Sequence, residues 1–158
     1  MEVRRVTGTD PVALELVAAM VGEIGAQYEP GLPKGSSASP SEISPPGGGF
    51  LVLWEDGRPL AGGGVKRLDE RACEIKRMYV APEARGRGLG RALLAALEDP
   101  ARDLGYAVAR LDTGPKQPRA QRMYERAGYV PVPDYNANPY ASFWGEKTLV
   151  ARDRRGGS

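Results

Sequence analysis

The run Arg-Gly-Arg-Gly-Leu-Gly-Arg at residues 85–91 constrains the fold of this chain more than any other segment. An apolar stretch typical of a strand ends shortly before it at Val80, and residues with helical spacing follow it as far as Leu104. At such a junction the first N–H groups of the helix have no intrahelical partner. Glycines leave these groups accessible, and the helix dipole adds partial positive charge. The segment therefore predicts a site for phosphate oxygens, to which three arginines add full charges.

Two common phosphate-binding motifs do not match this segment. A Walker A loop ends in Gly-Lys-Ser/Thr, whereas Gly90 is followed by Arg91 and Ala92. A dinucleotide-binding fingerprint has its third glycine three places after the second, where this chain has Arg91. A phosphate binder of another class, such as a kinase, needs a metal-holding carboxylate beside the loop, and only Glu83 is close. The plainest alternative is an Arg- and Gly-rich turn that only connects a strand to a helix.

The hydrophobic pattern of the whole chain predicts a meander of strands followed by helices placed between strands. Strands are expected at 2–6, 50–54, 60–67, 72–80, 107–112, 129–132 and 142–150, and helices at about 11–28, 91–104 and 119–127. Asp10 is expected to cap the first helix and Gly128 to follow the third. Pro100 is expected to kink or shorten the second. This order indicates a mixed α/β or α+β fold.

A single domain over residues 1–150, followed by a polar tail at 151–158, is the organisation that the length favours. Fifteen of the 20 residues from Pro30 to Gly49 are Pro, Gly or Ser, which predicts a flexible loop. Such a loop is either a lid or binding loop, or simply a disordered part of the surface.

Charge and residue usage exclude several classes of function. The 22 basic and 20 acidic residues give a net charge of +2, which offers no reason to expect nucleic acid or a membrane as partner. The absence of histidine excludes Ser-His-Asp and Cys-His catalysis, and it argues against a metal site. Cys73 is the one cysteine, so no internal disulfide forms, and a reducing cytoplasm is expected. No apolar run approaches the roughly 20 residues that cross a bilayer.

The chain resembles the GNAT superfamily of N-acetyltransferases in two motifs. The sequence from Arg85 to Gly90 is similar to the family's Arg/Gln-x-x-Gly-x-Gly/Ala signature, with a strand and Ala81-Pro82 ahead of it. The sequence from Ala120 to Tyr129 resembles the family's Ala-x-x-x-Tyr-Glu-x-x-Gly-Phe/Tyr segment. The resemblance covers roughly residues 50–149. It implies a twisted mixed sheet of about seven strands, flanked by three to four helices.

The resemblance implies acetyl-CoA as cofactor. In the family the sheet opens between its fourth and fifth strands, which here corresponds to an opening between 76–80 and 107–112. The pantetheine arm is expected to pair with the backbone of Met78 and Val80, and the Met78 amide to polarise the thioester carbonyl. Many members have Asn where this chain has Gln117. The residues expected to contact the cofactor are Met78, Val80, Arg85, Gly86, Arg87, Gly88, Leu89, Gly90, Arg91, Gln117 and Tyr124.

Two residues match catalytic positions of the family. Tyr124 resembles the general acid that protonates the departing thiolate, and its alternative role is to pack its ring and orient the thiol. Glu74 matches a position where some members carry a general base, and its alternative role is an ion pair with Lys66 or Lys76. On a regular strand Glu74 and Met78 would share one face, roughly 13 Å apart at ~3.3 Å per residue. Direct proton transfer over that distance would need a bent strand or an ordered water.

The expected reaction is transfer of an acetyl group to a primary amine, directly within a ternary complex. A small-molecule amine is favoured over a protein lysine, because the residues suit a pocket more than an exposed groove. Candidates for the acceptor pocket are Tyr28, Thr113, Tyr135, Asn136 and Trp144. The alternative function is a non-catalytic module that binds acetyl-CoA and regulates. An open final strand that pairs with a second copy would make a homodimer.

Overall fold

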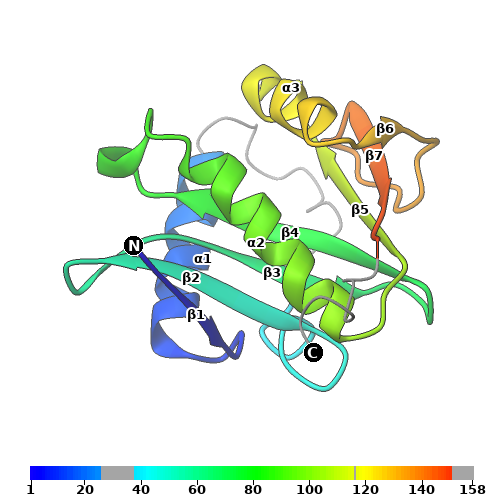
Figure 1. The fold of residues 1–158 in the computed structure, drawn as a ribbon. Helices are drawn as coiled ribbons and strands as arrows, with labels where there is room; N and C mark the ends of the chain where they lie inside the picture. Colours follow the sequence, from blue (N-terminus) through cyan, green and yellow to red (C-terminus); the bar gives the residue numbers. More distant parts are fainter. Residues whose placement is uncertain (26–37, 116, 151–158) are drawn as a thin grey trace.

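The computed structural model describes residues 1–25, 38–115 and 117–150. Seven strands form one sheet in the order β1-β2-β3-β4-β5-β7-β6 (Figure 1). All neighbours are antiparallel except β4 and β5, which are parallel. The strands are β1 (Glu2–Val6), β2 (Gly49–Glu55), β3 (Arg58–Arg67), β4 (Ala72–Val80), β5 (Val108–Thr113), β6 (Val130–Pro131) and β7 (Phe143–Thr148). This mixed sheet confirms the predicted α+β fold.

Helices cover both faces of the sheet. Helix α1 (Pro11–Gly25) lies behind the sheet in the view of Figure 1, and α2 (Leu89–Asp103) lies in front of it. Helix α3 (Pro118–Arg126) follows β5, and a short 3-10 turn, Pro82–Ala84, precedes α2. The larger hydrophobic cluster, with Leu93 and Leu97, lies on the α2 side, and a second cluster with Leu16 and Phe50 lies on the α1 side. Each face therefore has its own apolar core.

The helix ends follow the sequence signals, with one exception. Asp10 accepts the N–H of Val12 through Oδ1 at 3.0 Å, as the cap prediction requires. Gly128 follows α3 with φ 101°, which glycine adopts without strain. The expected shortening of α2 at Pro100 does not occur, because the helix continues to Asp103. Packing of its buried face offsets the one hydrogen bond that a proline removes.

The described part of the Pro/Gly/Ser loop packs against the α1 side. Ala38, Ile43 and Gly48 are buried, and Ile43 contacts the cluster around Phe50. A Cβ at Gly48 would lie 2.2 Å from the carbonyl oxygen of Glu42, so this close approach requires glycine. Residues 30–37 of the predicted loop lie outside the described residues.

Strand β4 contains a bulge that alters which side chains share a face. Gly62 pairs with Tyr79 and Gly64 with Lys76, so Gly63 alone faces two residues of β4. One of them, Arg77, has φ 60°. The other, Met78, packs on the α2 side, where its Cγ lies 3.1 Å from a Cβ built on Gly63. The regular strand that would place Glu74 and Met78 on one face is therefore not formed.

The side chains of β4 alternate up to the bulge. Cys73 and Ile75 belong to the cluster beneath α2. Glu74 and Lys76, which alternate with them, therefore face the α1 side. After the bulge, Tyr79 packs against the α1-side cluster. The bulge thus separates a polar stretch on the α1 side from apolar side chains under α2.

The sheet opens between β4 and β5. The two strands pair only from Ala72↔Val108 to Glu74↔Arg110. Beyond Arg110, β5 continues to pair with β7 as far as Thr113, and Figure 1 shows β4 and β5 diverging toward α3. This confirms the predicted opening on β4 and corrects its extent on β5, since the strand from Val108 to Arg110 is still paired.

The final strand is not an edge of the sheet. Strand β7 lies between β5 and β6, which pairs with it at Glu146 and Gly145. The expected open final strand is therefore wrong, because the turn after α3 returns β6 to that edge.

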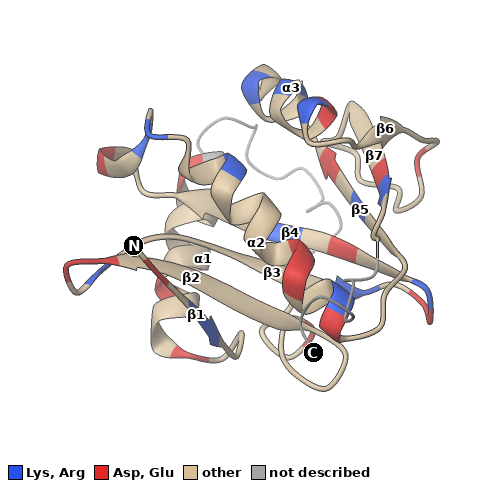
Figure 2. Ribbon diagram, viewed as in Figure 1, with Lys and Arg blue, Asp and Glu red and all other residues tan. Residues whose placement is uncertain are grey.

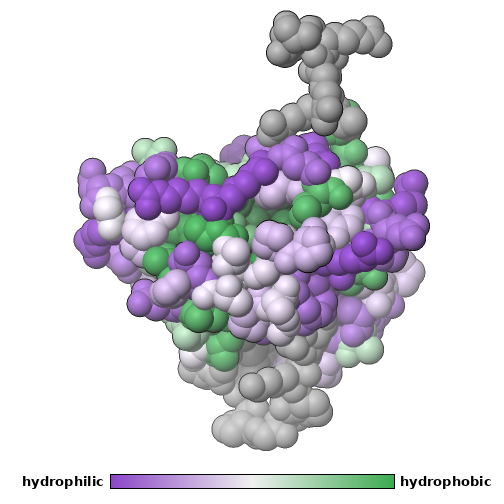
Figure 3. Space-filling model, turned by 90° about the horizontal axis from the view of Figure 1, so that it is seen from below, coloured by the Kyte–Doolittle hydropathy of each residue, from purple (hydrophilic) through white to green (hydrophobic). Residues whose placement is uncertain are grey.

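In Figure 3 hydrophobic side chains on the visible face lie in small groups among polar ones. Within residues 1–25, 38–115 and 117–150, no helix is both long and apolar enough to cross a bilayer.

Candidate active site

The start of α2 presents backbone donors that the described chain does not use. Gly88 is the N-cap, with φ 77° and ψ 16°, and no side chain caps the helix. Gly86 has φ 83° and, like Gly88, nothing within 4 Å of a built Cβ, so conformation rather than crowding favours glycine. The N–H groups of Leu89, Gly90 and Arg91 donate to no described residue. These groups are the donors that the predicted diphosphate site requires.

Two of the arginines in this run are engaged by acidic residues of neighbouring elements. Arg85 contacts both carboxylate oxygens of Glu23 at 2.8 and 2.6 Å, and its Nε donates to the carbonyl of Val80 at 3.0 Å. These hydrogen bonds raise the pKa of Arg85 and lower that of Glu23. Arg87 donates to Glu55 at 2.8 Å. These two guanidinium groups are therefore already paired with carboxylates, whereas the N–H groups at the start of α2 are not engaged by described residues.

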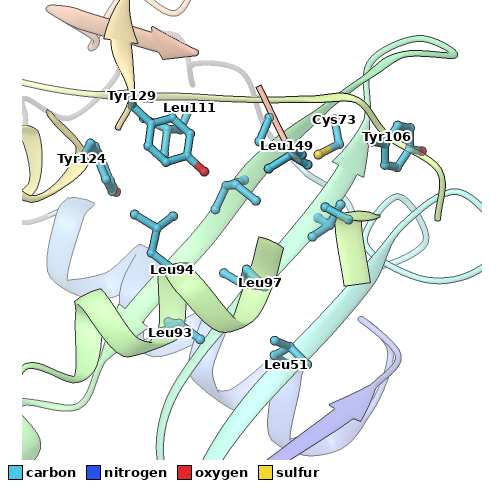
Figure 4. Packing of buried hydrophobic residues seen from close by; sticks show 14 of the residues in the cluster. Leu51, Cys73, Leu93, Leu94, Leu97, Tyr106, Leu111, Tyr124, Tyr129 and Leu149 are labelled. Atoms are coloured by element: carbon cyan, nitrogen blue, oxygen red, sulfur yellow. The ribbon is translucent and has the colours of Figure 1, made fainter. Parts of the chain in front are cut away.

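Tyr124 on α3 is buried on the α2 side of the sheet. It is 9% exposed, and its ring meets Tyr129 edge-on with centroids 6.3 Å apart. Figure 4 shows both rings above Leu94 of α2. Burial raises the pKa of Tyr124 to about 12, with a further contribution from the charge of Asp112. At neutral pH the phenol therefore keeps its proton and can donate it in a hydrogen bond.

Helix α3 is held between the opening and the start of α2. A Cβ built on Gly90 would lie 3.3 Å from Sδ of Met123, so the two helices approach closely there. Gln117, the N-cap residue of α3, accepts a hydrogen bond from the hydroxyl of Thr113 at 3.1 Å. Because Thr113 ends β5, this contact ties the helix that carries Tyr124 to the strand beside the opening.

A buried charged cluster lies where β4 and β5 separate. Glu74 is fully buried, and its Oε2 accepts hydrogen bonds from the hydroxyl of Tyr135 at 2.5 Å and from Nδ2 of Asn136 at 2.9 Å. The same Nδ2 donates to Oδ2 of Asp112 at 2.6 Å. Nζ of Lys76 lies 3.6 Å from Oε1 of Glu74 and 3.9 Å from Oδ2 of Asp112. Figure 2 shows that β4 and β5 each carry both acidic and basic residues.

The segment before β7 completes this cluster. Oδ1 of Asn136 accepts from the indole Nε1 of Trp144 at 3.0 Å, and Asn138 donates to Asp112 at 3.2 Å. Burial raises the pKa of Tyr135, and the charge of Glu74 raises it further. Tyr135 therefore stays protonated and donates to the carboxylate. Side chains of this segment thus bridge the strands at the point where backbone pairing has ended.

A second buried carboxylate lies on the α2 side, behind Tyr124. Oε2 of Glu98 accepts from the hydroxyl of Tyr129 at 2.9 Å, and Oε1 accepts from Nζ of Lys147 at 3.0 Å. The buried side chain of Glu98 is thereby satisfied by a hydrogen bond and an ion pair. The group holds Tyr129, whose ring contacts Tyr124, in a fixed position.

The comparisons with known proteins agree with this architecture. A sequence model of the Acetyltransferase (GNAT) family matches residues 19–129. The chain belongs to the GNAT family. It is 28% identical to the uncharacterized N-acetyltransferase YjgM of Escherichia coli K12 over 142 residues, which are 84% of this chain and 83% of YjgM.

Solved structures share the whole fold. A crystal structure of a Klebsiella pneumoniae protein covers 94% of this chain and 97% of its own, with 29% identity and a TM-score of 0.74. A GNAT family acetyltransferase from Elizabethkingia anophelis, solved with acetyl-CoA bound, has a TM-score of 0.67 at 16% identity and covers 94% of this chain and 97% of its own. As a member of the GNAT family, this chain is an acetyltransferase.

The GNAT structure brings several of the predicted acceptor residues together. Tyr135, Asn136 and Trp144 join Glu74 in one hydrogen-bonded group. Thr113 instead bonds to Gln117 at the other end of the opening. Tyr28 lies outside the described residues. For Glu74 the structure shows the ion pair with Lys76 and none with Lys66, which lies 3.3 Å from Glu42.

Sequence reasoning missed three members of the cluster as site residues. They are Lys76, Asp112 and Asn138, which contact Glu74 or one another. Lys76 and Asp112 each follow an apolar residue of their strand, Ile75 and Leu111, and both side chains are largely buried. A charged residue at an inward position is a usable signal. Asn138 lies in a loop, where sequence alone gives no register relative to the sheet.

Proposed function

We propose that this GNAT domain transfers the acetyl group of acetyl-CoA to the primary amine of a small molecule, directly within a complex that holds both substrates. The observation that supports this most is a juxtaposition. Unused N–H groups follow the end of β4, and a buried charged cluster lies where β4 leaves β5. Bound acetyl-CoA supplies an activated acetyl thioester. We assign the activity to residues 1–150 as one domain.

We propose that the backbone around α2 holds the cofactor. The N–H groups from Gly86 to Arg91 would bind the diphosphate, and the exposed Arg91 adds charge there. Beyond Glu74 the edge of β4 that faces β5 pairs with no described strand, which leaves Met78 and Val80 available to the pantetheine arm. The Val80 carbonyl already accepts a hydrogen bond from Arg85, so cofactor and arginine would share or exchange that acceptor.

Tyr124 is proposed to assist the departure of the thiol. With a pKa of about 12 it holds its proton across the physiological range. A thiol near ~8.5 is the stronger acid, so complete proton transfer from Tyr124 would be uphill by about 5 kcal/mol. A hydrogen bond from the phenol to the developing thiolate avoids that cost. Tyr124 therefore acts as a hydrogen-bonding acid, whose ring position is fixed by Tyr129.

Glu74 is proposed to receive the proton of the amine. Its Oε2 already accepts two hydrogen bonds, whereas Oε1 accepts none from a described residue. Oε1 is therefore the atom with capacity for a proton or an ordered water. Because Glu74 is fully buried, an ordered water is the natural link to the amine. Glu74 and Asp112 together carry two negative charges against the one positive charge of Lys76, and the remaining negative charge favours an ammonium group nearby.

The lone thiol supports a reducing cytoplasm as the place of action. Cys73 is buried, and burial raises its pKa to about 12. It stays protonated, which makes it an unreactive apolar side chain rather than a nucleophile. Direct transfer, without an acetyl group on the protein, is the mechanism consistent with that state.

Calorimetry and thiol release test the proposal together. CoA is titrated into wild type, Tyr124→Phe and Glu74→Gln, and each is then assayed with acetyl-CoA and a panel of small primary amines. All three proteins are expected to bind CoA, and both variants to lose at least about tenfold in kcat. If wild type does not bind CoA at millimolar concentration, or binds it and acetylates no amine, the proposal is wrong.

A further inference from the structure

Arg77 carries a charge that no acidic side chain of the described chain offsets. Its Nη2 donates one hydrogen bond, 3.5 Å long, to the carbonyl oxygen of Ala38. Its Nε is buried without a hydrogen-bond partner. Burial lowers the pKa of Arg77, and no carboxylate counteracts this effect. A guanidinium has five N–H donors, so most of its capacity is unused.

The other arginines of the described chain fall into two groups. One group forms ion pairs with carboxylates: Arg4, Arg5, Arg58, Arg85, Arg87, Arg102 and Arg110. The other group is exposed to solvent: Arg67, Arg71, Arg91, Arg119, Arg122 and Arg126. Within the described residues, only Arg77 is partly buried and also lacks a carboxylate. Burial of a charge without a counter-charge is unfavourable, so a bound anion would relieve it.

The position of Arg77 relates it to the acceptor side of the opening. Ala38, which its guanidinium contacts, packs in the cluster on the α1 side. The polar cluster of Glu74 and Asp112 includes Lys76, the residue directly before Arg77, and Glu74 and Lys76 face that same side. One face of the bulged strand therefore presents carboxylates first and an uncompensated guanidinium next.

We infer that Arg77 binds a carboxylate of the acceptor, so that the acceptor is a small amino acid or a related compound with a primary amine and a carboxylate. The inference rests on the proposed function and names its substrate class. The acidic cluster suits the ammonium group of such a molecule. The planar guanidinium suits its carboxylate, which accepts two parallel hydrogen bonds.

A purely structural role for Arg77 explains the geometry less well. Its φ of 60° belongs to the left-handed region, where glycine or asparagine is favoured over a long side chain. The single hydrogen bond to Ala38 is at the outer limit of length. Neither the backbone conformation nor the packing therefore explains an arginine at this place. Binding of a carboxylate ligand does explain it.

Matched acceptors test the inference on the intact protein. The proteinogenic amino acids, β-alanine and 4-aminobutanoate are each assayed beside their carboxamides, which keep the amine and lose the negative charge. The enzymes are wild type, Arg77→Met, Arg77→Lys and, as control, Arg71→Met at an exposed site. Thiol release gives kcat and KM, and melting curves with CoA calorimetry establish that each variant is folded and binds cofactor.

We expect at least one free acid to exceed its carboxamide about tenfold or more in kcat/KM. Arg77→Met should raise KM for that acid about 10- to 100-fold and leave KM for the carboxamide unchanged. Arg77→Lys should retain part of the preference, and Arg71→Met all of it. If Arg77→Met does not fold, Arg77→Lys carries the comparison.

Three results would overturn the inference. The first is that carboxamides are acetylated as well as their acids. The second is that acids are left unused while other amines react. The third is that Arg77→Met keeps the preference for acids. Any of these outcomes with CoA binding intact rejects the role of Arg77 and leaves the acetyltransferase proposal standing. Loss of CoA binding in wild type rejects the proposed function itself.

Discussion

Asn136 is the side chain whose removal should most disturb the opening. Its Nδ2 donates to Glu74 of β4 at 2.9 Å and to Asp112 of β5 at 2.6 Å, while its Oδ1 accepts from Trp144 of β7 at 3.0 Å. Hydrogen bonds to charged groups contribute about 1.5–3 kcal/mol each, and neutral ones about 0.5–1.5. Because Asn136 is itself partly exposed, the lower ends apply, and Asn136→Ala should cost about 3.5 kcal/mol.

Urea unfolding measures this cost. With an m-value of about 2 kcal/mol/M, the midpoint should fall by roughly 1.8 M while m stays unchanged. Asn138→Ala is the matched control, because the side chain of Asn138 makes one hydrogen bond to a charged group, Asp112, at 3.2 Å and accepts one from the N–H of Tyr140 at 3.0 Å, so its loss should cost only about 2 kcal/mol. In the same variants kcat should fall further for Asn136→Ala, with the Kd for CoA unchanged. Equal midpoints for the two variants would refute the argument that Asn136 bridges the strands.

Three further predictions concern other parts of the site. Arg91→Glu places a negative charge beside the unused N–H groups of α2. Calorimetry should therefore show a Kd for CoA about tenfold higher than that of wild type at low salt, and a smaller difference at high salt. An unchanged Kd would contradict the diphosphate assignment. Tyr129→Phe removes the 2.9 Å hydrogen bond to Glu98 and should lower the free energy of unfolding by about 1–2 kcal/mol, whereas a more stable variant would show that the bond contributes nothing. Burial raises the pKa of Tyr124 from 10.0 to about 12, so the neutral phenol stabilises the fold below pH 10, and this contribution is lost as the pH rises to about 12. Between pH 10 and 12, chemical denaturation should show that wild type loses about 3 kcal/mol more of its free energy of unfolding than Tyr124→Phe does. Parallel curves for the two proteins would mean that the phenol is not buried.

The elements were readable from sequence because each has a local signal, whereas the opening of the sheet was expected only from the resemblance to the GNAT family. The hydrophobic period identified the strands and helices, and Gly86 and Gly88 marked the turn into α2 at positive φ. A glycine of β3 permits a close approach to α2, since a Cβ at Gly63 would lie 2.8 Å from Leu97. The bulge itself was not predicted to fall in β4, because an arginine at positive φ has no sequence signature.

Apart from the ion pair of Glu74 with Lys76, the partners within the charged cluster could not be predicted. Glu74 and Asp112 come from strands that pair for only three residues, so their approach depends on where the pairing stops. Asn136 reaches both from a loop, and its position depends on Asp134, which accepts the N–H of Asn136 at 3.0 Å. Such contacts are set by tertiary geometry, whereas sequence patterns report only the face and the element.

The bulge at Arg77 accounts for both sides of the site at once. In a regular strand Met78 would follow Lys76 onto the α1 side, where its apolar side chain would lie among the charges of Glu74 and Asp112. The extra residue instead returns Met78 to the core beneath α2 and leaves Tyr79 on the α1 side. The strand thereby keeps apolar side chains toward Tyr124 and polar ones toward the acceptor. Deleting Arg77 should remove the bulge but keep Met78 beneath α2 and Tyr79 on the α1 side, because Met78 would then follow Lys76 directly. The sheet should therefore still form while acetyl transfer is lost with the local bend, and a deletion variant with normal kcat would show that the bulge has no part in the site.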